Sequence, residues 1–211
     1  MALSDYHKKY AALSDAEIQR RADIKERELK TIFSVVPFQP AHEHVRIFVV
    51  GCGDRRFIDH HRRIFSSLLG RDVDLTTSDI AIEHLAGAPG VIRHDATKPF
   101  PGGPYDITYA HVFLKFIETE KQWDVLMNSW NALREGGIAI HVMDLEEIDA
   151  PAAALDGGLH AVPLTRWKKQ LEGEGIHFKE AAWKIEGILK NPLSGRALIL
   201  LKERKISTHD D

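Results

Sequence analysis

The sequence contains almost no cysteine and no long apolar run. Cys52 is the only cysteine among 211 residues, which excludes an intrachain disulfide and a cysteine zinc cluster. A single cysteine is typical of a reducing compartment, so we expect a cytoplasmic protein. No apolar run approaches the ~20 residues that a membrane helix needs. The first residues also lack the apolar middle region of a signal peptide, and we expect no membrane partner.

An excess of positive charge is also missing. The formal net charge is −3 with the histidines neutral, which disfavours a general nucleic-acid binder and leaves room only for a local basic patch. The 12 histidines are scattered and form no H-E-x-x-H motif, so we predict no metal site. The apolar fraction of 44% and the charged fraction of 28% suit one globular domain with a real core.

Strands that alternate with helices predict an α/β fold. This alternation implies a mostly parallel sheet with both faces covered by helices. A left-handed glycine in Glu135-Gly136-Gly137 is expected to end the helix at 118–134, and Thr165 is expected to start a helix at 165–174. The last two strands predict an antiparallel hairpin on the sheet edge. The other expected elements are helices at 57–68 and 80–85, and strands at 45–50, 72–78, 91–94, 105–110, 138–143, 176–185 and 196–202.

A helix precedes the first strand. Ser14 and Glu17 have the spacing of a capping box, and helical periodicity continues to about Ile32 or Phe33. Two interpretations are open, a helix packed on the domain edge or a flap over a ligand, and we take the first as the working interpretation. The expected division of the chain is a helical extension at 1–40, an α/β domain at 41–204 and a polar tail at 205–211.

The stretch V-R-I-F-V-V-G-C-G-D at residues 45–54 predicts a binding site. Strand, glycine turn and helix follow one another here, and open α/β sheets bind ligands at the carboxyl ends of their strands. Asp79 and Asp95 follow the next two strands. Asp79 could accept two ribose hydroxyls and Asp95 the exocyclic amine of a purine. The alternative for each acid is a helix cap.

With these residues the chain resembles the class I S-adenosylmethionine-dependent methyltransferases, over about residues 43–203. The resemblance rests on V-V-G-C-G-D, T-T-S-D-I, R-H-D-A-T-K-P-F-P-G-G-P-Y-D-I-T-Y-A-H and N-A-L-R-E-G-G-I-A-I. It implies a three-layer, Rossmann-like open sheet of seven strands, S-adenosylmethionine as the cofactor, and methyl transfer. No Pro-Pro-Tyr motif for flipped bases follows the fourth strand, so we expect a small-molecule substrate.

The resemblance also implies roles for individual residues. The glycine turn would approach the methionine part of the cofactor, Asp79 would hold the ribose, and Asp95 would lie at the adenine. His111 would face the methyl end. The implied cofactor-binding residues are Gly51, Cys52, Gly53, Asp54, Arg55, Asp79, Ile80, Asp95, Ala96 and Ala110.

His111 is the candidate catalytic base, because an unperturbed imidazole titrates near neutral pH. The alternative is that His111 only caps or hydrogen-bonds its loop. Tyr109 and Phe113 could line the same pocket or belong to the core. His61 falls on the apolar stripe of its helix, which indicates a packed histidine.

The glycine turn departs from the family pattern on both sides. Val49 stands where the family usually has an acid, and Arg55 stands where a third glycine is usual. Arg55 and Arg56 fall in the first turn of a helix. Either both side chains extend into water, or one of them pairs with the cofactor's carboxylate, which an arginine can bind with two hydrogen bonds.

Two other functions stay open at this stage. Val49 and Arg55 favour a degenerate protein that kept the fold and serves as a binding or scaffolding module. An NAD-dependent oxidoreductase is the third hypothesis. It is weaker, because Arg56 replaces the third glycine of G-x-G-x-x-G.

Overall fold

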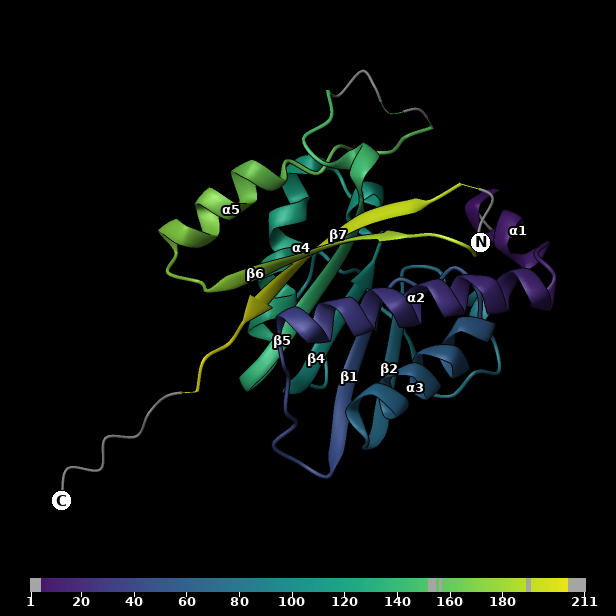
Figure 1. Cartoon of the computed structure of the whole chain (residues 1–211), viewed down its shortest axis with the longest axis horizontal. Coiled ribbons are helices and arrows are strands. Elements are labelled where there is room, and N and C mark those ends of the chain that lie inside the picture. Colours follow the sequence, from purple (N-terminus) through teal and green to yellow (C-terminus); the bar gives the residue numbers. More distant parts are fainter. Residues whose placement is uncertain (1–4, 152–154, 156, 189–190, 205–211) are drawn as a thin grey trace.

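Seven strands form one sheet within the residues that the structure describes, 5–151, 155, 157–188 and 191–204 (Figure 1). In this computed structural model the strand order is β3-β2-β1-β4-β5-β7-β6. Neighbours from β3 to β5 pair in parallel, whereas β7 is antiparallel to both β5 and β6. The predicted sheet with its antiparallel hairpin is confirmed. The strands are β1 (His44–Val50), β2 (Asp72–Asp79), β3 (Val91–Arg93), β4 (Tyr105–His111), β5 (Leu133–Asp144), β6 (Phe178–Ile185) and β7 (Leu193–Leu201).

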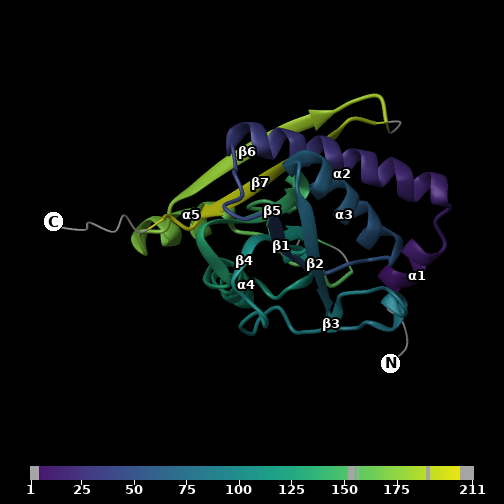
Figure 2. The same ribbon diagram turned by 90° about the horizontal axis from the view of Figure 1, so that it is seen from below.

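Helices cover both faces of the sheet, which confirms the predicted three layers. Helices α2 and α3 pack on one face and α4 and α5 on the other, each pair with its own hydrophobic cluster. Helix α2 lies alongside α3 and β6 (Figure 2). The helices are α1 (Asp5–Ala11), α2 (Asp15–Val35), α3 (Arg56–Leu69), α4 (Thr119–Asn131) and α5 (Leu164–Gly173), and the short 3₁₀ turns are η1 (Glu83–Leu85), η2 (Leu114–Phe116) and η3 (Leu145–Glu147).

The inner strand β1, between β2 and β4, is buried on both faces, because its residues alternate between the two clusters. Ile47 and Val49 pack with α2 and α3, and Phe48 and Val50 pack with α4 and α5. All four side chains are at most 1% exposed. This burial fixes the end of β1, and therefore the position of the glycine turn that follows it.

Helix α2 begins as the sequence predicts. The Ser14 hydroxyl accepts a hydrogen bond from the Glu17 N–H at 3.3 Å, and the Glu17 carboxylate accepts one from the Ser14 N–H at 2.9 Å, which completes the capping box. Ile18 and Leu29 are fully buried, so α2 packs on the domain. Other residues of α2 also line the cavity described below, so the helix combines features of the two interpretations. The boundary expected at residue 40 stays a prediction.

The predicted end of the helix at 118–134 is wrong. Helix α4 ends at Asn131, and Leu133 already pairs with Tyr105 of β4. The segment Glu135-Gly136-Gly137 therefore lies inside β5 rather than capping a helix. Gly136 does adopt a positive φ of 79°, but it does so within the strand, where its N–H donates to the carbonyl of Lys202. Sheet pairing overrides the local helix propensity here.

Two other local predictions are also wrong. Residues 80–85 form only the turn η1 rather than a helix. Helix α5 starts at Leu164, and Thr165 lies within its first turn. The Thr165 hydroxyl donates to the Asp149 carboxylate at 2.7 Å, so it ties the helix to the preceding loop and does not cap it.

Some expectations fall beyond the described residues. The polar tail, 205–211, lies outside them, as do residues 1–4. In the part of the chain that the structure describes, no helix combines the length and the apolar character that crossing a membrane requires.

Candidate functional site

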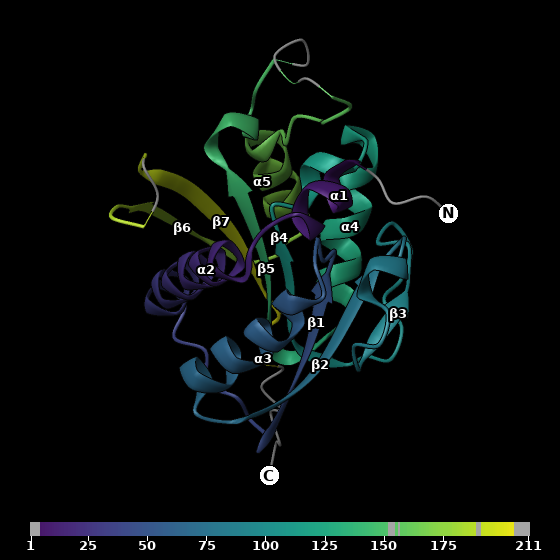
Figure 3. The same cartoon turned by 90° about the vertical axis from the view of Figure 1, so that its right-hand side faces the viewer.

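A cavity of about 430 Å³ opens at the carboxyl ends of β1, β2 and β4. Helix α1 lies at this end of the sheet (Figure 3). The volume is within the range of small-molecule sites, and the position is the one where open α/β sheets bind ligands. Most of the predicted site residues line it, namely Gly51, Cys52, Gly53, Asp79, Ile80, Asp95, Ala96 and His111.

The turn after β1 requires glycine at its first position. Gly51 has a φ of 74°, which other residues rarely adopt. A Cβ atom at Gly51 would lie 2.5 Å from Cδ2 of Phe113. The Gly51 N–H donates to the carbonyl of Ser78 at 2.8 Å. The backbone of the turn is thus held against β2 and leaves the cavity open above it.

Asp79 is fixed at the edge of the cavity by the glycine turn itself. One carboxylate oxygen accepts a hydrogen bond from the Cys52 N–H at 3.1 Å, and the other accepts one from the Ala81 N–H at 3.1 Å. Each oxygen keeps a further lone pair that can accept a hydrogen bond from a ligand. The structure therefore brings the predicted turn and the predicted acid together.

Asp95 lies in the cavity wall after β3. Its Oδ1 accepts hydrogen bonds from the N–H of Thr97 at 2.9 Å and from the Thr97 hydroxyl at 2.8 Å. These bonds lower the pKa of Asp95. Ala96 beside it is buried. Asp95 is therefore a fixed anion at the position predicted for the adenine end of a cofactor.

Three predicted cofactor residues do not line the cavity, namely Asp54, Arg55 and Ala110. Arg55 is exposed, and its closest polar contact is the carbonyl of Ala86 at 3.5 Å. The structure therefore does not place Arg55 where it could pair with a carboxylate in the cavity. Ala110 lies on β4 and is buried beneath the site.

Asp54 has a structural partner. Its carboxylate accepts a hydrogen bond from Nη2 of Arg56 at 2.7 Å, and Nη1 of Arg56 donates to Asp15 at 2.7 Å. Burial opposes the shift, but the bonds from Arg56 lower the pKa of Asp54. Arg56 also donates to the carbonyl of Leu13 at 2.9 Å. The pair therefore links the helix start after the glycine turn to the loop before α2.

His111 meets a carboxylate that the sequence analysis missed. Its Nε2 lies 2.8 Å from Oε2 of Glu28, a buried residue of α2. Because Nε2–H donates to Glu28, Nδ1 of His111 keeps its lone pair. Burial and the charge of Lys25 lower the pKa of His111, against the raising effect of Glu28. The imidazole is therefore neutral near pH 7 and can accept a proton.

Lys25 is a second residue of α2 that the sequence analysis missed. It lines the cavity and is 8% exposed. Burial lowers its pKa to about 8, against the raising effect of Glu28. A signal was present, because Lys25 falls on the helical spacing set by Ile18 and Ala22 and continued by Leu29 and Ile32. A charged residue on the apolar stripe of a helix is expected to be buried, and a buried charge is often functional.

Two further polar groups belong to the cavity wall. His61 is buried as predicted, and neither of its ring nitrogens has a hydrogen-bond partner among the described residues. Lys115, also in the cavity wall, pairs with Asp144 at 3.3 Å and, more closely, with Glu147, which is buried behind the lining residues. Burial raises the pKa of Glu147 to about 7. The cavity wall therefore contains further ionisable groups besides His111, Glu28 and Lys25.

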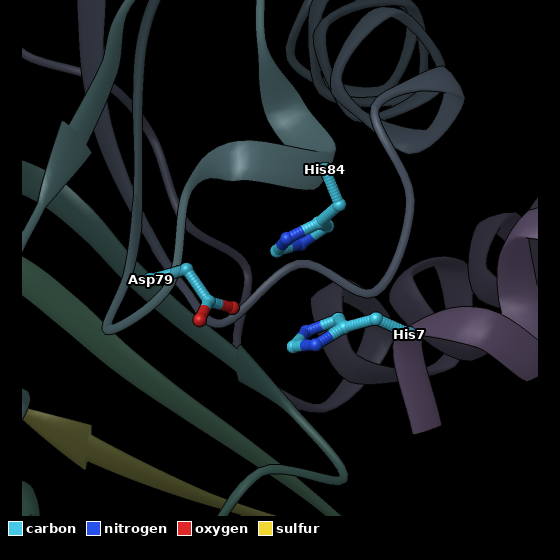
Figure 4. A group of neighbouring side chains, drawn as sticks. All are labelled: His7, Asp79 and His84. Atoms are coloured by element: carbon cyan, nitrogen blue, oxygen red, sulfur yellow. The ribbon is translucent and has the colours of Figure 1, made fainter. Parts of the chain in front are cut away.

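Figure 4 shows His7, Asp79 and His84 side by side. The imidazoles of His7 and His84 are stacked with centroids 3.9 Å apart. Each of the three residues offers one ligand atom within 4.8 Å of the others, a donor set that could hold a divalent metal ion. The sequence analysis missed this cluster, because His7 and His84 come from distant segments. A metal here would occupy Asp79 and compete with a ribose.

Part of the chain matches a known protein family. Residues 48–141 match the model of a methyltransferase domain. No curated protein sequence matches the chain. Among solved structures, a LepI variant in complex with S-adenosylhomocysteine and a substrate analogue has a TM-score of 0.56 at 12% identity, with 82% of this chain and 46% of that chain covered.

Two more structures show the same fold. The CMeT domain of the citrinin polyketide synthase has a TM-score of 0.57 at 17% identity, with 87% of this chain and 52% of that chain covered. A SAM-dependent methyltransferase from Methanosarcina mazei has a TM-score of 0.56 at 14% identity, with 82% and 96% covered. The chain thus spans about half the length of the LepI and citrinin synthase chains and nearly all of the archaeal one.

The family match and the sheet topology together define the class. Residues 48–141 match the methyltransferase-domain family, and the seven-stranded sheet around them has the topology of a class I, Rossmann-like methyltransferase fold. The matched segment includes the glycine turn, Asp79, Asp95 and His111. This is the class that the sequence predicts, the S-adenosylmethionine-dependent methyltransferases.

Proposed function

We propose that this protein transfers a methyl group from S-adenosylmethionine to a small molecule. The observation that carries the proposal is Asp79, which the Cys52 N–H holds at the edge of the cavity at 3.1 Å. A fixed carboxylate beside a glycine turn suits a ribose with two hydroxyl donors. We also propose a cytoplasmic location, which the single cysteine supports.

The residues present fit this cofactor along the cavity. Gly51 to Gly53 leave room for its amino-acid end, and Asp79 accepts its ribose hydroxyls. Asp95 has Oδ2 without a hydrogen bond among the described residues, so this oxygen is available for the adenine amine. Ile80, 67% exposed at the cavity edge, offers an apolar surface to the adenosine.

His111 and Glu28 supply the proton chemistry. When bound, S-adenosylmethionine supplies the methyl group, whose carbon–sulfur bond breaks as the bond to the acceptor forms. An acceptor hydroxyl or amine must lose a proton in this process. Nδ1 of His111 takes that proton, and Glu28 holds the ring by its other nitrogen and stabilises the imidazolium that forms. The same arrangement orients histidine bases in other enzymes.

A small acceptor suits the walls of the cavity. Phe113, Phe116 and Ile117 provide apolar surface, and Lys115 and Asp144 provide charge. The degenerate-scaffold alternative rested on Val49 and Arg55. Val49 is a core residue and Arg55 is exposed, so neither side chain obstructs the cavity.

Calorimetric titration with S-adenosylmethionine, S-adenosylhomocysteine and NAD tests the proposal. The wild type should bind the first two and not NAD. Asp79→Asn should weaken the binding of S-adenosylmethionine and of S-adenosylhomocysteine by roughly tenfold or more, as expected for a lost charge-assisted hydrogen bond. Asp72→Asn, at the exposed opposite end of β2, is the matched control. Tight NAD binding with no response to S-adenosylhomocysteine would overturn the proposal.

A further inference from the structure

The ammonium of Lys25 is buried in the cavity wall without an ionic partner. The side chain projects from the middle of α2 and is 8% exposed. Among the described residues it makes no hydrogen bond and no ion pair. Its one close polarisable neighbour is the ring of Phe57, whose centroid lies 5.3 Å from Nζ. A buried cation is normally paired with an anion. The ammonium of Lys25 can therefore still bind an anionic ligand in the cavity.

Among the described residues, no neighbouring charge forms an ion pair with Lys25, although the charge of Glu28 acts on it. Glu28, on the same helix, uses its carboxylate to accept the hydrogen bond from His111. The other groups whose charge acts on Lys25 are Arg21 on α2, Cys52 in the glycine turn and Asp144 at the end of β5. Asp144 is paired with Lys115. Burial raises the pKa of the Cys52 thiol to about 12, so it carries no charge.

Lys25 stays protonated at neutral pH, since its pKa is about 8. The cavity wall therefore presents a desolvated positive charge beside the glycine turn, at the end where the amino-acid part of the cofactor would lie. Arg55 is not available for this part, because it lies outside the cavity. Val49, where related proteins usually have an acid, is in the core. Lys25 thus supplies a positive charge at this end of the cavity, beside the carboxylate of Glu28 that is hydrogen-bonded to His111.

We propose that Lys25 is the carboxylate-binding residue of the cavity. The ligand chemistry is a carboxylate at the end of the cavity next to Cys52 and Glu28. This carboxylate belongs either to the amino-acid end of the cofactor or to the methyl acceptor. A carboxylate from the cofactor rests on the proposed function, whereas a carboxylate from the acceptor does not. The experiment therefore distinguishes these two sources.

The experiment compares wild type, Lys25→Met and the matched control Lys30→Met by calorimetry. Lys30 lies on the same helix and is exposed, and its ion-pair partner among the residues that the structure describes is Glu26. The probes are S-adenosylhomocysteine, which has the carboxylate, and 5′-methylthioadenosine, which has the adenosyl thioether without it. Benzoate, added to protein saturated with 5′-methylthioadenosine and to protein saturated with S-adenosylhomocysteine, probes for a carboxylate from the acceptor.

If Lys25 binds the cofactor's carboxylate, Lys25→Met weakens S-adenosylhomocysteine by roughly tenfold to hundredfold and leaves 5′-methylthioadenosine unchanged. If the carboxylate is the acceptor's, both nucleosides bind as before, and Lys25→Met abolishes benzoate binding to the S-adenosylhomocysteine complex. Either result supports the proposal. Equal loss of both nucleosides, or no change with any probe, overturns it.

Two controls keep the result interpretable. Lys25→Arg retains the charge, and we expect it to keep the preference for S-adenosylhomocysteine over 5′-methylthioadenosine even if Lys25→Met folds poorly. Loss of that preference in a folded Lys25→Arg protein would also count against the proposal. If the wild type binds neither nucleoside, the proposed function fails, and benzoate binding to the free protein still decides the role of Lys25.

Discussion

His111 at the end of β4 and Glu28 in the middle of α2 form a hydrogen-bonded pair of 2.8 Å across the cavity wall. The two residues are 83 positions apart in the chain. This contact ties the N-terminal helix to the predicted chemistry, since it orients the candidate base. It also explains why α2 contains a buried carboxylate.

The first prediction concerns this pair. Glu28→Gln should lower the pKa of His111 further, because Glu28 is a group that raises it. The acid limb of the pH profile for methyl transfer should then move to lower pH. NMR titration of the imidazole measures the shift directly. Glu26→Gln, on the same helix and paired with the exposed Lys30, should leave the His111 pKa unchanged. A rise of that pKa in Glu28→Gln would contradict the assignment.

The second prediction compares two adjacent arginines. Arg56→Met should lower the free energy of unfolding by about 2 kcal/mol, because it removes the charged hydrogen-bond partner of the buried Asp54 from a position that water still partly reaches. Arg55→Met should change neither the stability nor the affinity for S-adenosylhomocysteine, because Arg55 is exposed and outside the cavity. Urea unfolding and calorimetry measure both. If Arg55→Met weakened the binding of S-adenosylhomocysteine, our placement of Arg55 outside the cavity would be wrong.

The third prediction tests the glycine turn. Gly51→Ala meets two obstacles, a φ of 74° and the ring of Phe113 at 2.5 Å from the new Cβ. Gly70→Ala has a comparable φ of 60° but nothing within 4 Å. In both variants, backbone strain should lower the free energy of unfolding by about 1 kcal/mol. Gly51→Ala should lower it further, because of the contact with Phe113, and should also weaken cofactor binding. Equal melting temperatures for the two would show that the contact with Phe113 is unimportant.

The fourth prediction is acid sensitivity. Burial lowers the pKa of His141 to about 3, whereas an unfolded histidine titrates near 6.5. The folded state therefore binds fewer protons below pH 6.5, and stability falls as the pH falls from there toward 3. His141 accounts for about 2 kcal/mol of that loss by pH 5.

Urea unfolding at pH 7 and pH 5 checks this prediction. His141→Gln should reduce the loss between the two pH values by about the same amount. His42→Gln, on the exposed loop before β1, should retain the full wild-type loss. An unchanged loss in His141→Gln would mean that His141 is not the responsible group.

The sequence predicted the parts of the site that depend on local pattern. The strand, the glycine turn and the acid after the next strand are each encoded within a few residues, and the parallel sheet brings their ends together. Gly51, Asp79 and Asp95 therefore lie where the pattern placed them. Helix boundaries were less predictable. Leu133 continues a helical pattern locally, but its pairing with Tyr105 decides its conformation.

The features of the site that could not be predicted from the sequence depend on tertiary contacts. Arg55 and Arg56 are adjacent in sequence, and only the position of Asp54 and Asp15 decides which of them forms ion pairs. Lys25 and Glu28 reach the cavity because α2 packs beside α3 and across the sheet. Helical spacing offered a signal for the burial of Lys25, which the sequence analysis missed, and it contained no signal for what Lys25 faces.

A crystal structure of the complex with S-adenosylhomocysteine tests the central claim most directly. We predict that the ribose hydroxyls donate to the Asp79 carboxylate, with the amino-acid end next to Gly51 and the adenine beside Asp95. A nucleoside bound elsewhere, with Asp79 contacting only the backbone N–H groups of Cys52 and Ala81, would contradict it.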